Sequence, residues 1–453
     1  MSKTNMTTGN IGSKLIRYSI PLMLGNFFQL TYNAADSVIV GKFSGENALA
    51  AVGSANPIMN LTILGISGIC IGASVLMSNF FGAGDYKNLK KEISITGFIG
   101  IIISALFVLG GLLFSKSLLV RLHVPEEILD LATAYLRIIL LGTPFTFLYN
   151  MLSSVFRSIG DSKTPLIFLT ISAGLNILMD LVLVAKFGYG VIGAAVSTVI
   201  AEAFSGIFCI VYVYRNVPYL RIKKEDFVID RVLLWQTLES GMASALQQAC
   251  QPVGKLFIQS TINTQGVAAI AAFNAVSRVD DFAFTPQQSI GTSIMTFVAQ
   301  NRGAGKKERI KKGLRSGLKL EFIYWIIICS ATLLFKEPLM KLFSNEGSGD
   351  MITIGVSYLN LMAFFYIFSS FTNGIQGYFR GMGKLRTTLF FTFIQISIRA
   401  LFVVFLVPRM GIRGVAYASI IGWSAMILGE YPYAYFTQKK YEEAESVAKL
   451  KVG

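Results

Sequence analysis

Two aspartates, Asp36 and Asp180, stand within long apolar segments of the sequence. An ionised side chain inside a membrane helix costs about 2.5–3.5 kcal/mol, so each is a candidate functional group. Asn176 lies four residues before Asp180 and therefore shares its face of a helix. Oxygen atoms from Asp36, Asn176, Asp180 and Thr198 would suit a proton or a sodium ion. The alternative is a hydrogen-bonded cluster that only joins helices.

Further polar residues in apolar segments are candidates for contact with a solute. We assign this role to Tyr32, Asn150 and Gln251, because polar side chains in membrane helices bind substrate or hold helices together. Pro21 lies fifteen residues before Asp36 in the same segment. Proline removes one helical hydrogen bond, so Pro21 is a candidate hinge.

The composition indicates a membrane protein that is not an enzyme. Hydrophobic residues make up 53% of the chain and charged residues 14%, whereas soluble proteins have about 25% charged residues. The net charge of +15 comes from short basic clusters between apolar runs, without a nucleic-acid motif, so no nucleic-acid partner is expected. The single histidine, His123, and four cysteines without metal or redox spacing argue against a histidine-based metal site or triad. No cofactor is expected beyond a coupling ion, H⁺ or Na⁺.

Twelve stretches are long and apolar enough to span a bilayer, which takes about 20 residues. Their approximate ranges are 15–41, 49–81, 93–114, 128–154, 164–185, 190–214, 232–259, 267–299, 316–335, 351–379, 387–407 and 412–436. The expected fold is therefore an all-α polytopic membrane protein with twelve transmembrane helices.

The basic residues between these spans predict the orientation. One alternate set of loops and ends holds 27 lysines and arginines, and the other set holds 8. The more basic side of a membrane protein faces the cytoplasm. We therefore expect a protein of the bacterial cytoplasmic (inner) membrane with both termini in the cytoplasm.

The sequence repeats itself at an offset near 221 residues. Gly-Ala-Gly occurs at 82–84 and again at 303–305, and Arg-x-x-Gly occurs at 157–160 and again at 380–383. Six spans per repeat place two pseudo-symmetric lobes in the same orientation. The predicted division is 1–214 for the N-lobe, 215–231 for a cytoplasmic linker, 232–436 for the C-lobe and 437–453 for a cytoplasmic tail.

Basic residues of the second repeat correspond to the acidic site of the first. Lys255 lies 219 residues after Asp36, and Arg399 lies 223 residues after Asn176. One interpretation is that Lys255 and Arg399 line a C-lobe cavity and bind an anionic group of the substrate. The other is that they pair with acidic residues and fix helix packing; the candidates are Glu239, Asp280 and Asp281.

These motifs together resemble the multidrug and toxic compound extrusion (MATE) family. The resemblance covers nearly the whole chain. It is carried by Pro21, Tyr32, Asp36 and Gly41, by the repeated loops at 82–85 and 300–305, by the loop at 157–161, by Asn176 and Asp180, and by 193–195 with Thr198. The pair Asp36 and Asp180 resembles the DinF-type branch. The tenth span has no acidic residue in its body, so the second ion site of other branches is not carried over.

The resemblance implies two six-helix lobes and efflux of organic cations coupled to entry of H⁺ or Na⁺. The substrate is expected to be a small organic cation or zwitterion, the transporter a monomer in the lipid bilayer, and the mechanism alternating access between the lobes. The alternative is a flippase or exporter of a lipid-linked or anionic metabolite, which a basic C-lobe cavity would suit.

Overall fold

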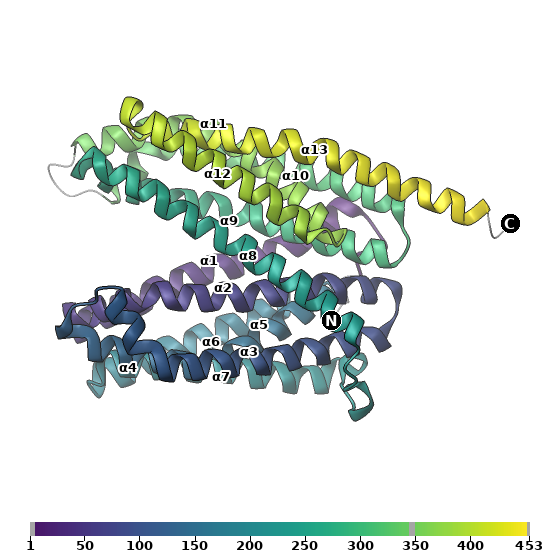
Figure 1. The fold of residues 1–453 in the computed structure, drawn as a ribbon, viewed down its shortest axis with the longest axis horizontal. Coiled ribbons are helices and arrows are strands. Elements are labelled where there is room, and N and C mark those ends of the chain that lie inside the picture. Colours follow the sequence, from purple (N-terminus) through teal and green to yellow (C-terminus); the bar gives the residue numbers. More distant parts are fainter. Residues whose placement is uncertain (1–4, 344–348, 451–453) are drawn as a thin grey trace. The chain divides into compact units, whose positions relative to one another are not determined.

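The structure, a computed structural model, describes residues 5–343 and 349–450 and is built of α-helices, with no strand in those ranges (Figure 1). The helices are α1 (Ile11–Ser44), α2 (Glu46–Ala83), α3 (Tyr86–Arg121), α4 (Glu126–Leu141), α5 (Thr143–Ser158), α6 (Lys163–Asp180) with its extension η1 (Leu181–Lys186), α7 (Gly190–Asn216), α8 (Arg231–Ile262), α9 (Val267–Gly303), α10 (Lys307–Lys341), α11 (Gly349–Gly381), α12 (Leu385–Met410) and α13 (Arg413–Leu450). Short 3-10 turns η2 (Pro218–Leu220), η3 (Lys224–Asp226) and η4 (Asn263–Gln265) lie between helices.

Each predicted span coincides with one helix, except that the span at 128–154 is the bent pair α4 and α5. The two helices meet at Gly142 with a bend of 45°. Pro144 stands at the start of α5, and a proline cannot continue the hydrogen-bond ladder of the preceding helix. The chain is thus a twelve-span helical membrane protein with a kink that the hydropathy pattern did not reveal.

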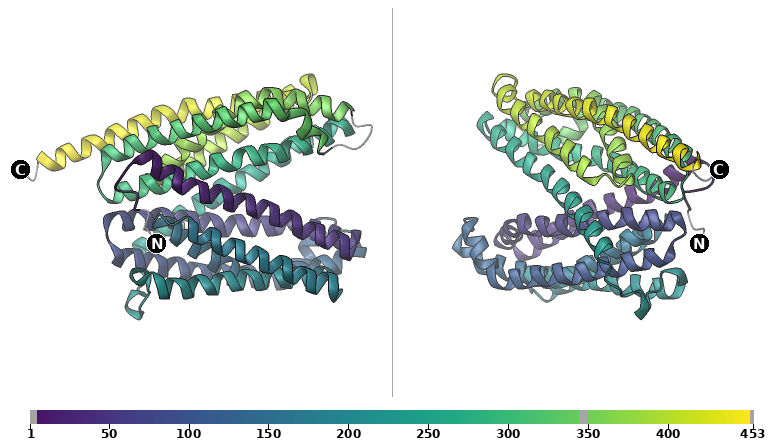
Figure 2. Two further views of the ribbon diagram at one scale, coloured as in Figure 1. Left: turned by 180° about the vertical axis from the view of Figure 1, so that it is seen from behind. Right: turned by 45° about the vertical axis from the view of Figure 1, so that its right-hand side comes forward.

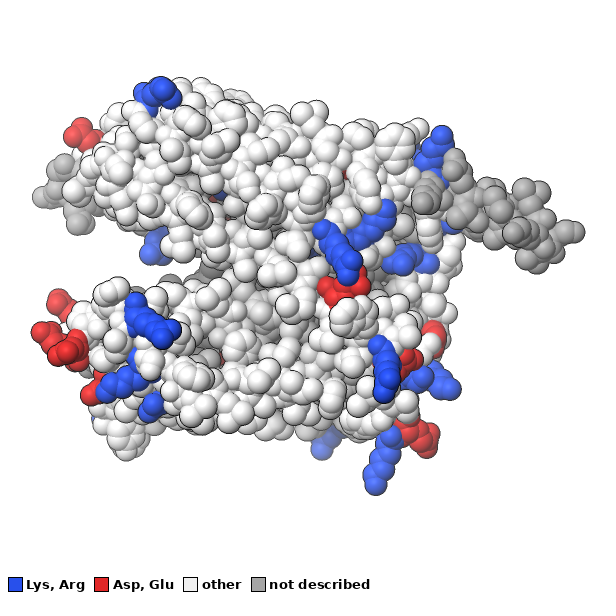
Figure 3. All heavy atoms as spheres, viewed as in Figure 1, with Lys and Arg blue, Asp and Glu red and all other residues white. Residues whose placement is uncertain are grey.

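The outer faces of the helices are apolar. On α3, Ile101, Leu106 and Leu113 expose 72%, 65% and 69% of their surface. Apolar surface on this scale is what lipid covers in a membrane. On the face drawn in Figure 3, the Lys, Arg, Asp and Glu side chains gather mainly towards the left and right of the view, with uncharged residues between them.

The helices form two compact units. Unit 1 contains Pro21–Ala245, and unit 2 contains Asn5–Ile20 and the chain from Leu246 onward. The lobe boundaries predicted from the sequence lie at other positions, 214 and 232. The difference arises because α1 and α8 are continuous helices, each of which begins in one unit and ends in the other. Figure 2 shows α1, in purple, as one unbroken helix. The division into two lobes stays a prediction, because it follows the repeat in the sequence and not the boundaries of the two units.

In unit 1, α2 packs against α3, α4 and α5, and α6 packs against α7. The first half of α8 lies unusually close to α2. A methyl group added at Gly68 would come within 2.3 Å of the Cα atom of Ala245, and one added at Gly72 within 2.4 Å of the backbone nitrogen of Gly241. Only glycine permits such an approach, as in other closely packed membrane helices.

In unit 2, α9 packs against α10 and α11, and α12 packs against α13. The α9–α11 contact also depends on glycine, because a methyl group at Gly377 would lie 2.2 Å from the carbonyl oxygen of Gly291. The N-terminal segment packs on α9. The hydroxyl groups of Tyr18 and Thr296 are 3.1 Å apart, and Ser293 donates to the backbone oxygen of Leu15 at 3.1 Å.

The repeated sequence motifs are repeated turns. Gly84, Gly160, Gly305 and Gly383 all adopt positive φ, between 66° and 88°. After each glycine the next amide donates to the carbonyl five residues before it, at 2.8–3.0 Å. This is the hydrogen bond of a Schellman helix end, where glycine avoids the steric cost of the left-handed conformation. The repeat in the sequence is therefore a repeat in backbone structure.

Candidate functional site

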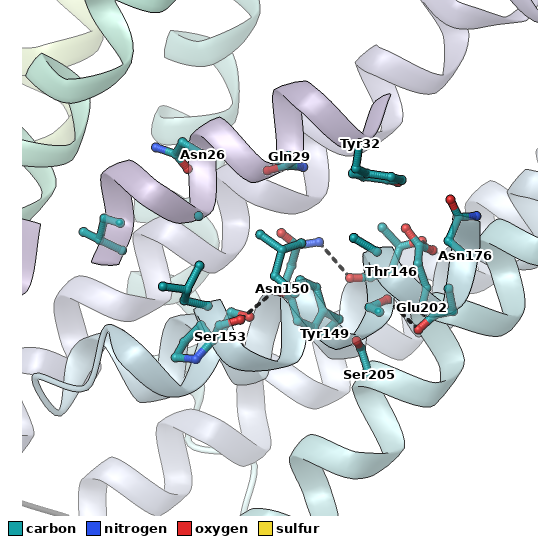
Figure 4. A pocket seen from close by; sticks show the side chains of 18 of the residues that line it. Asn26, Gln29, Tyr32, Thr146, Tyr149, Asn150, Ser153, Asn176, Glu202 and Ser205 are labelled. Carbon is teal, nitrogen blue, oxygen red and sulfur yellow. Dashed lines mark hydrogen bonds between the residues drawn. The ribbon is translucent and has the colours of Figure 1, made fainter. Parts of the chain in front are cut away.

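A cavity of about 190 Å³ lies within unit 1, lined by α1, α5, α6 and α7 (Figure 4). The α5 side of the cavity is polar because Thr146, Asn150, Ser153 and Arg157 follow one another at helical spacing. Residues three, four and seven positions apart share one face of a helix, so α5 presents its whole polar stripe to the cavity. The predicted substrate residue Asn150 belongs to this stripe.

The facing helices add polar stripes of their own. On α1 the stripe contains Asn26, Gln29 and Tyr32, which Figure 4 shows opposite the α5 residues. On α7 it contains Glu202 and Ser205. The helices therefore form an elongated, hydrogen-bonding cavity, in which the predicted residues Tyr32 and Asn150 lie on opposite walls. The predicted hinge Pro21 also contributes to the lining.

The four predicted ion-coupling residues come together beside this cavity. Asn176 and Thr198 line it, and Asp180 is fully buried next to them. The amide of Asn176 donates to the hydroxyl of Thr198 at 3.4 Å. The carboxyl group of Asp36, on α1, faces that of Asp180, on α6. Two carboxyl groups, an amide and a hydroxyl group thus lie together in one region, and their role in ion coupling stays a prediction.

Ser197 holds this region together and was missed by the sequence analysis. Its hydroxyl donates to the carboxylate of Asp180 and accepts from the amide of Asn176 at 3.3 Å. Its position next to Thr198 was the available signal. However, a serine inside an apolar helix more often bonds only to its own backbone, and Ser197 also bonds to the carbonyl of Ala194.

Three buried oxygen atoms of the region accept no hydrogen bond from the described residues. They are Oδ1 of Asp36, Oδ1 of Asn176 and Oδ2 of Asp180. Buried polar atoms are normally paired, so each unpaired atom calls for an explanation. A proton shared between the carboxyl groups, or a small cation among the three oxygens, would provide the missing partner. No group of three His, Cys, Asp or Glu suitable for a metal occurs within 5–343 and 349–450.

The basic residues predicted in the second repeat belong to unit 2, whereas the region around Asp180 belongs to unit 1. Lys255 on α8 pairs with Asp281 on α9 at 3.4 Å. Arg399 on α12 lies near Asp280, whose two carboxylate oxygens accept hydrogen bonds from Tyr358 at 2.8 Å and Tyr366 at 2.6 Å. Lys255 thus has an acidic partner, whereas Arg399 has an acidic neighbour and its Nε has no hydrogen-bond partner among the described residues. The remaining predicted substrate residue, Gln251, is exposed on α8.

Two acidic residues lie towards the ends of predicted spans, Glu321 in 316–335 and Glu430 in 412–436. Both are fully buried in unit 2 and do not reach the membrane surface. Glu430 accepts a hydrogen bond from Gln376 at 2.8 Å, whereas both oxygens of Glu321 accept none from the described residues. The helices α10 and α13 extend beyond their predicted spans, so these positions lie inside the helices rather than at their ends.

Glu92 was not considered as a membrane residue, because the predicted third span began at residue 93. It is fully buried on α3 and accepts hydrogen bonds from Thr237 of α8 at 2.9 and 3.0 Å. Both of its oxygens lie within hydrogen-bonding distance of this one hydroxyl group, so Glu92 links α3 to α8 within unit 1.

Comparisons with known proteins agree with this architecture. The sequence profile of the MatE family matches residues 21–182 and 243–405. A probable multidrug resistance protein of Bacillus subtilis, YpnP, is 29% identical over 87% of this chain and 88% of its own length. An FAD transporter of Shewanella oneidensis is 27% identical over 74% of this chain and 75% of its own length.

Among solved structures, a MATE protein crystallised in the bent conformation superimposes with a TM-score of 0.92 at 23% identity, over 98% of this chain and 99% of that chain. The family profile covers the two repeats separately, which matches the repeat in sequence and in backbone structure. The chain therefore belongs to the MatE family of multi-pass membrane transporters, the multidrug and toxic compound extrusion proteins.

Proposed function

We propose that this transporter exports organic solutes from the cell in exchange for an entering cation, H⁺ or Na⁺. The observation that carries the proposal is the set of three unpaired oxygens, from Asp36, Asn176 and Asp180, beside a polar cavity in the same unit. A solute in the cavity and an ion on the carboxyl groups are close enough to influence each other through Asn176 and Thr198, which belong to both sites. That sharing is what an antiporter requires.

The ion would act by changing the charge of the buried region. With the region empty, two facing carboxylates repel each other and attract a cation. When a proton or sodium ion binds, Asp180 keeps its serine hydrogen bond while its second oxygen gains a partner. The region is then less negative and attracts a cationic solute nearby less strongly, so ion entry and solute release become linked.

Helix α1 connects the ion site to the rest of the protein. Pro21 is the residue at which α1 passes from unit 2 into unit 1, and Asp36 lies farther along the same helix. Proline lowers the cost of bending because it removes a backbone hydrogen bond. We propose that ion binding at Asp36 changes the bend at Pro21 during alternating access. The protein would act as a monomer in the cytoplasmic membrane with both termini inside.

The test is transport by the purified protein in proteoliposomes, with ethidium as the solute. Proton and sodium gradients are imposed separately while the membrane potential is held at zero. We expect one of the two gradients to drive ethidium against its own gradient, and the Asp36→Asn protein to show no driven movement. An ethidium flux that depends on neither the proton gradient nor the sodium gradient would contradict cation antiport.

An anionic metabolite is the second candidate substrate. It is favoured by Arg157, which lines the unit 1 cavity, and by the similarity to a protein named an FAD transporter. The same proteoliposomes loaded with FAD provide the comparison. Driven movement of FAD without driven movement of ethidium would favour export of an anionic metabolite over export of organic cations.

A further inference from the structure

The lining of the unit 1 cavity contains two charged residues, Glu202 and Arg157. They lie at opposite ends of the polar stripe of α5. Glu202 accepts a hydrogen bond from Thr146, at the start of that stripe, and Arg157 stands at its end. Eleven residues separate Thr146 from Arg157, which corresponds to about 16 Å along a helix axis. The cavity therefore has an acidic end and a basic end.

Glu202 is placed to face a molecule in the cavity. It lies four residues after Thr198 and three before Ser205 on α7, and all three residues line the cavity. Figure 4 shows the Glu202 side chain beside Thr146, across from Tyr32. The aromatic side chains of Tyr32 and Tyr149 line the same cavity. A carboxylate among aromatic rings is the chemistry that recognises organic ammonium groups.

We propose that Glu202 binds the cationic centre of the transported substrate, as a site separate from the Asp36–Asp180 pair that exchanges the coupling ion. The substrate class is an organic cation with its positive group at the Glu202 end and a flat or elongated body along α5. This proposal rests on the proposed function and adds the residue that determines specificity for charge. Nothing in the family motifs quoted above includes Glu202.

The separation of roles follows from hydrogen bonding and burial. Asp180 is fully buried and has an unpaired oxygen that faces Asp36, whereas Glu202 is partly exposed in the cavity wall and is oriented by Thr146. A small cation is satisfied by the three unpaired oxygens of Asp36, Asn176 and Asp180. A larger organic cation needs the volume of the cavity, whose lining includes Glu202 but neither Asp36 nor Asp180.

The Glu202→Gln substitution separates a charge role from a structural role. Glutamine keeps the size of the side chain and an oxygen that can accept from Thr146, but it removes the charge. If Glu202 only ties α5 to α7, Glu202→Gln changes little. If it binds a cation, affinity for cations falls while affinity for anions does not.

The experiment measures dissociation constants by fluorescence polarisation, with the protein in lipid nanodiscs. The probes are rhodamine 123, a cation, and fluorescein, an anion with the same xanthene ring system. For Glu202→Gln we expect the Kd of rhodamine 123 to rise about tenfold, as for loss of one charge-assisted contact. The Kd of fluorescein should stay unchanged or fall. The matched control is Glu46→Gln, which removes an exposed glutamate of the same unit.

The Asp36→Asn protein distinguishes this inference from the proposed function. It should lose ion-driven transport, and its Kd for rhodamine 123 should no longer depend on the concentration of protons or sodium ions, whereas Glu202→Gln should keep that dependence at a weaker affinity. Equal changes in both dye affinities for Glu202→Gln would overturn the role of Glu202 and leave the ion site intact. A wild-type protein that binds fluorescein but not rhodamine 123 would overturn the cationic substrate class.

A second measurement uses the wild-type protein and does not depend on folding of a variant. Dicyclohexylcarbodiimide modifies carboxyl groups inside membranes, and mass spectrometry of peptides locates the product. Rhodamine 123 should protect Glu202 from modification, and fluorescein should not. Modification of Glu202 at the same rate with and without rhodamine 123 would contradict the proposal.

Discussion

Asp180 in unit 1 and Asp280 in unit 2 are buried aspartates with opposite surroundings. Asp280 receives one tyrosine hydroxyl on each carboxylate oxygen and lies near Arg399. Asp180 receives one serine hydroxyl, and its second oxygen has no donor among the described residues. A fully hydrogen-bonded carboxylate is already at its lowest free energy, whereas an incompletely paired one favours the arrival of an ion. The difference supports the proposed ion exchange at Asp180 in unit 1 and a structural role for Asp280 in unit 2.

Glu321 shows that an unpaired buried carboxyl group is not by itself a sign of ion exchange. It belongs to unit 2, and neither of its oxygens accepts a hydrogen bond from the described residues. Its neighbours include Gly374 and Tyr324, and the unit 1 cavity does not include it. An unpaired carboxyl group therefore suggests ion exchange only where a second carboxyl group and a cavity adjoin it, as they do at Asp36 and Asp180.

The largest effect is expected for Asp36→Asn and Asp180→Asn. Each variant keeps the shape of the side chain and removes the charge that a coupling ion must neutralise. We expect ion-driven ethidium transport in proteoliposomes to fall to the level of protein-free liposomes. Both proteins should still elute as single species on size-exclusion chromatography, because no ion pair is lost. Driven transport at the wild-type rate by either variant would place the ion site elsewhere.

The second effect is a loss of stability at Asp280. Asp280→Asn weakens two hydrogen bonds to a charged group, and such bonds contribute about 1.5–3 kcal/mol each. It also leaves the buried Arg399 near a neutral partner. We expect the melting temperature in detergent to fall by several degrees, while the protein that remains folded keeps its ion-driven transport.

If Asp280→Asn left the stability unchanged and abolished coupling, ion exchange would belong to Asp280 in unit 2 and not to unit 1. Tyr366→Phe supplies an independent check, because it removes one of the two donors to Asp280 without changing any charge. It should shift the melting temperature in the same direction as Asp280→Asn, and by less.

The helical architecture was predictable from the sequence because it depends on local hydropathy. Twelve apolar stretches, the basic loops and the 221-residue repeat predicted twelve spans in two similar halves. The repeated glycines proved to be Schellman turns, which explains why glycine recurs at those positions. The bend between α4 and α5 was not predicted, because Gly142 and Pro144 do not interrupt the apolar run.

The site was only partly predictable. Asp36, Asn176, Asp180 and Thr198 came from the resemblance and from spacing, and the structure brings them together. Ser197 determines which of these side chains lacks a hydrogen-bond donor. The angle at which α5 meets α7 determines which glutamate lines a cavity. Such contacts join residues distant in sequence, so composition and periodicity did not reveal Glu202 as a cavity residue or Glu321 as a buried one.

A third effect separates the two hydroxyl groups of the site. Ser197 donates to a charged oxygen of Asp180, whereas Thr198 contacts the neutral amide of Asn176 at 3.4 Å. Ser197→Ala should therefore reduce the driven transport rate and stability more than Thr198→Ala does, since a bond to a charged group contributes about twice that of a neutral one. The measurement is the initial rate of ion-driven ethidium transport per folded protein. A larger defect for Thr198→Ala would make Thr198 the principal ion ligand.

The smallest effect is expected at the Lys255–Asp281 pair. Both side chains are about half exposed, 51% and 56%, and their charged atoms are 3.4 Å apart. Exposed ion pairs contribute about 0.2–1 kcal/mol. A double-mutant cycle of Lys255→Met, Asp281→Asn and both together should give a coupling free energy within that range, measured by thermal unfolding in detergent.

The same cycle decides between the two roles of Lys255. If Lys255 is a structural partner of Asp281, the double variant loses less stability than the two single variants lose together. The preference for cationic over anionic dyes then stays unchanged. A substrate-binding lysine instead makes Lys255→Met lose affinity for fluorescein, whether or not Asp281 is present. We expect the first outcome, because the acidic partner is already in place beside Lys255. A fluorescein Kd that rises in both Lys255→Met proteins would show that unit 2 also contacts the substrate, and would end the division of roles between the two units.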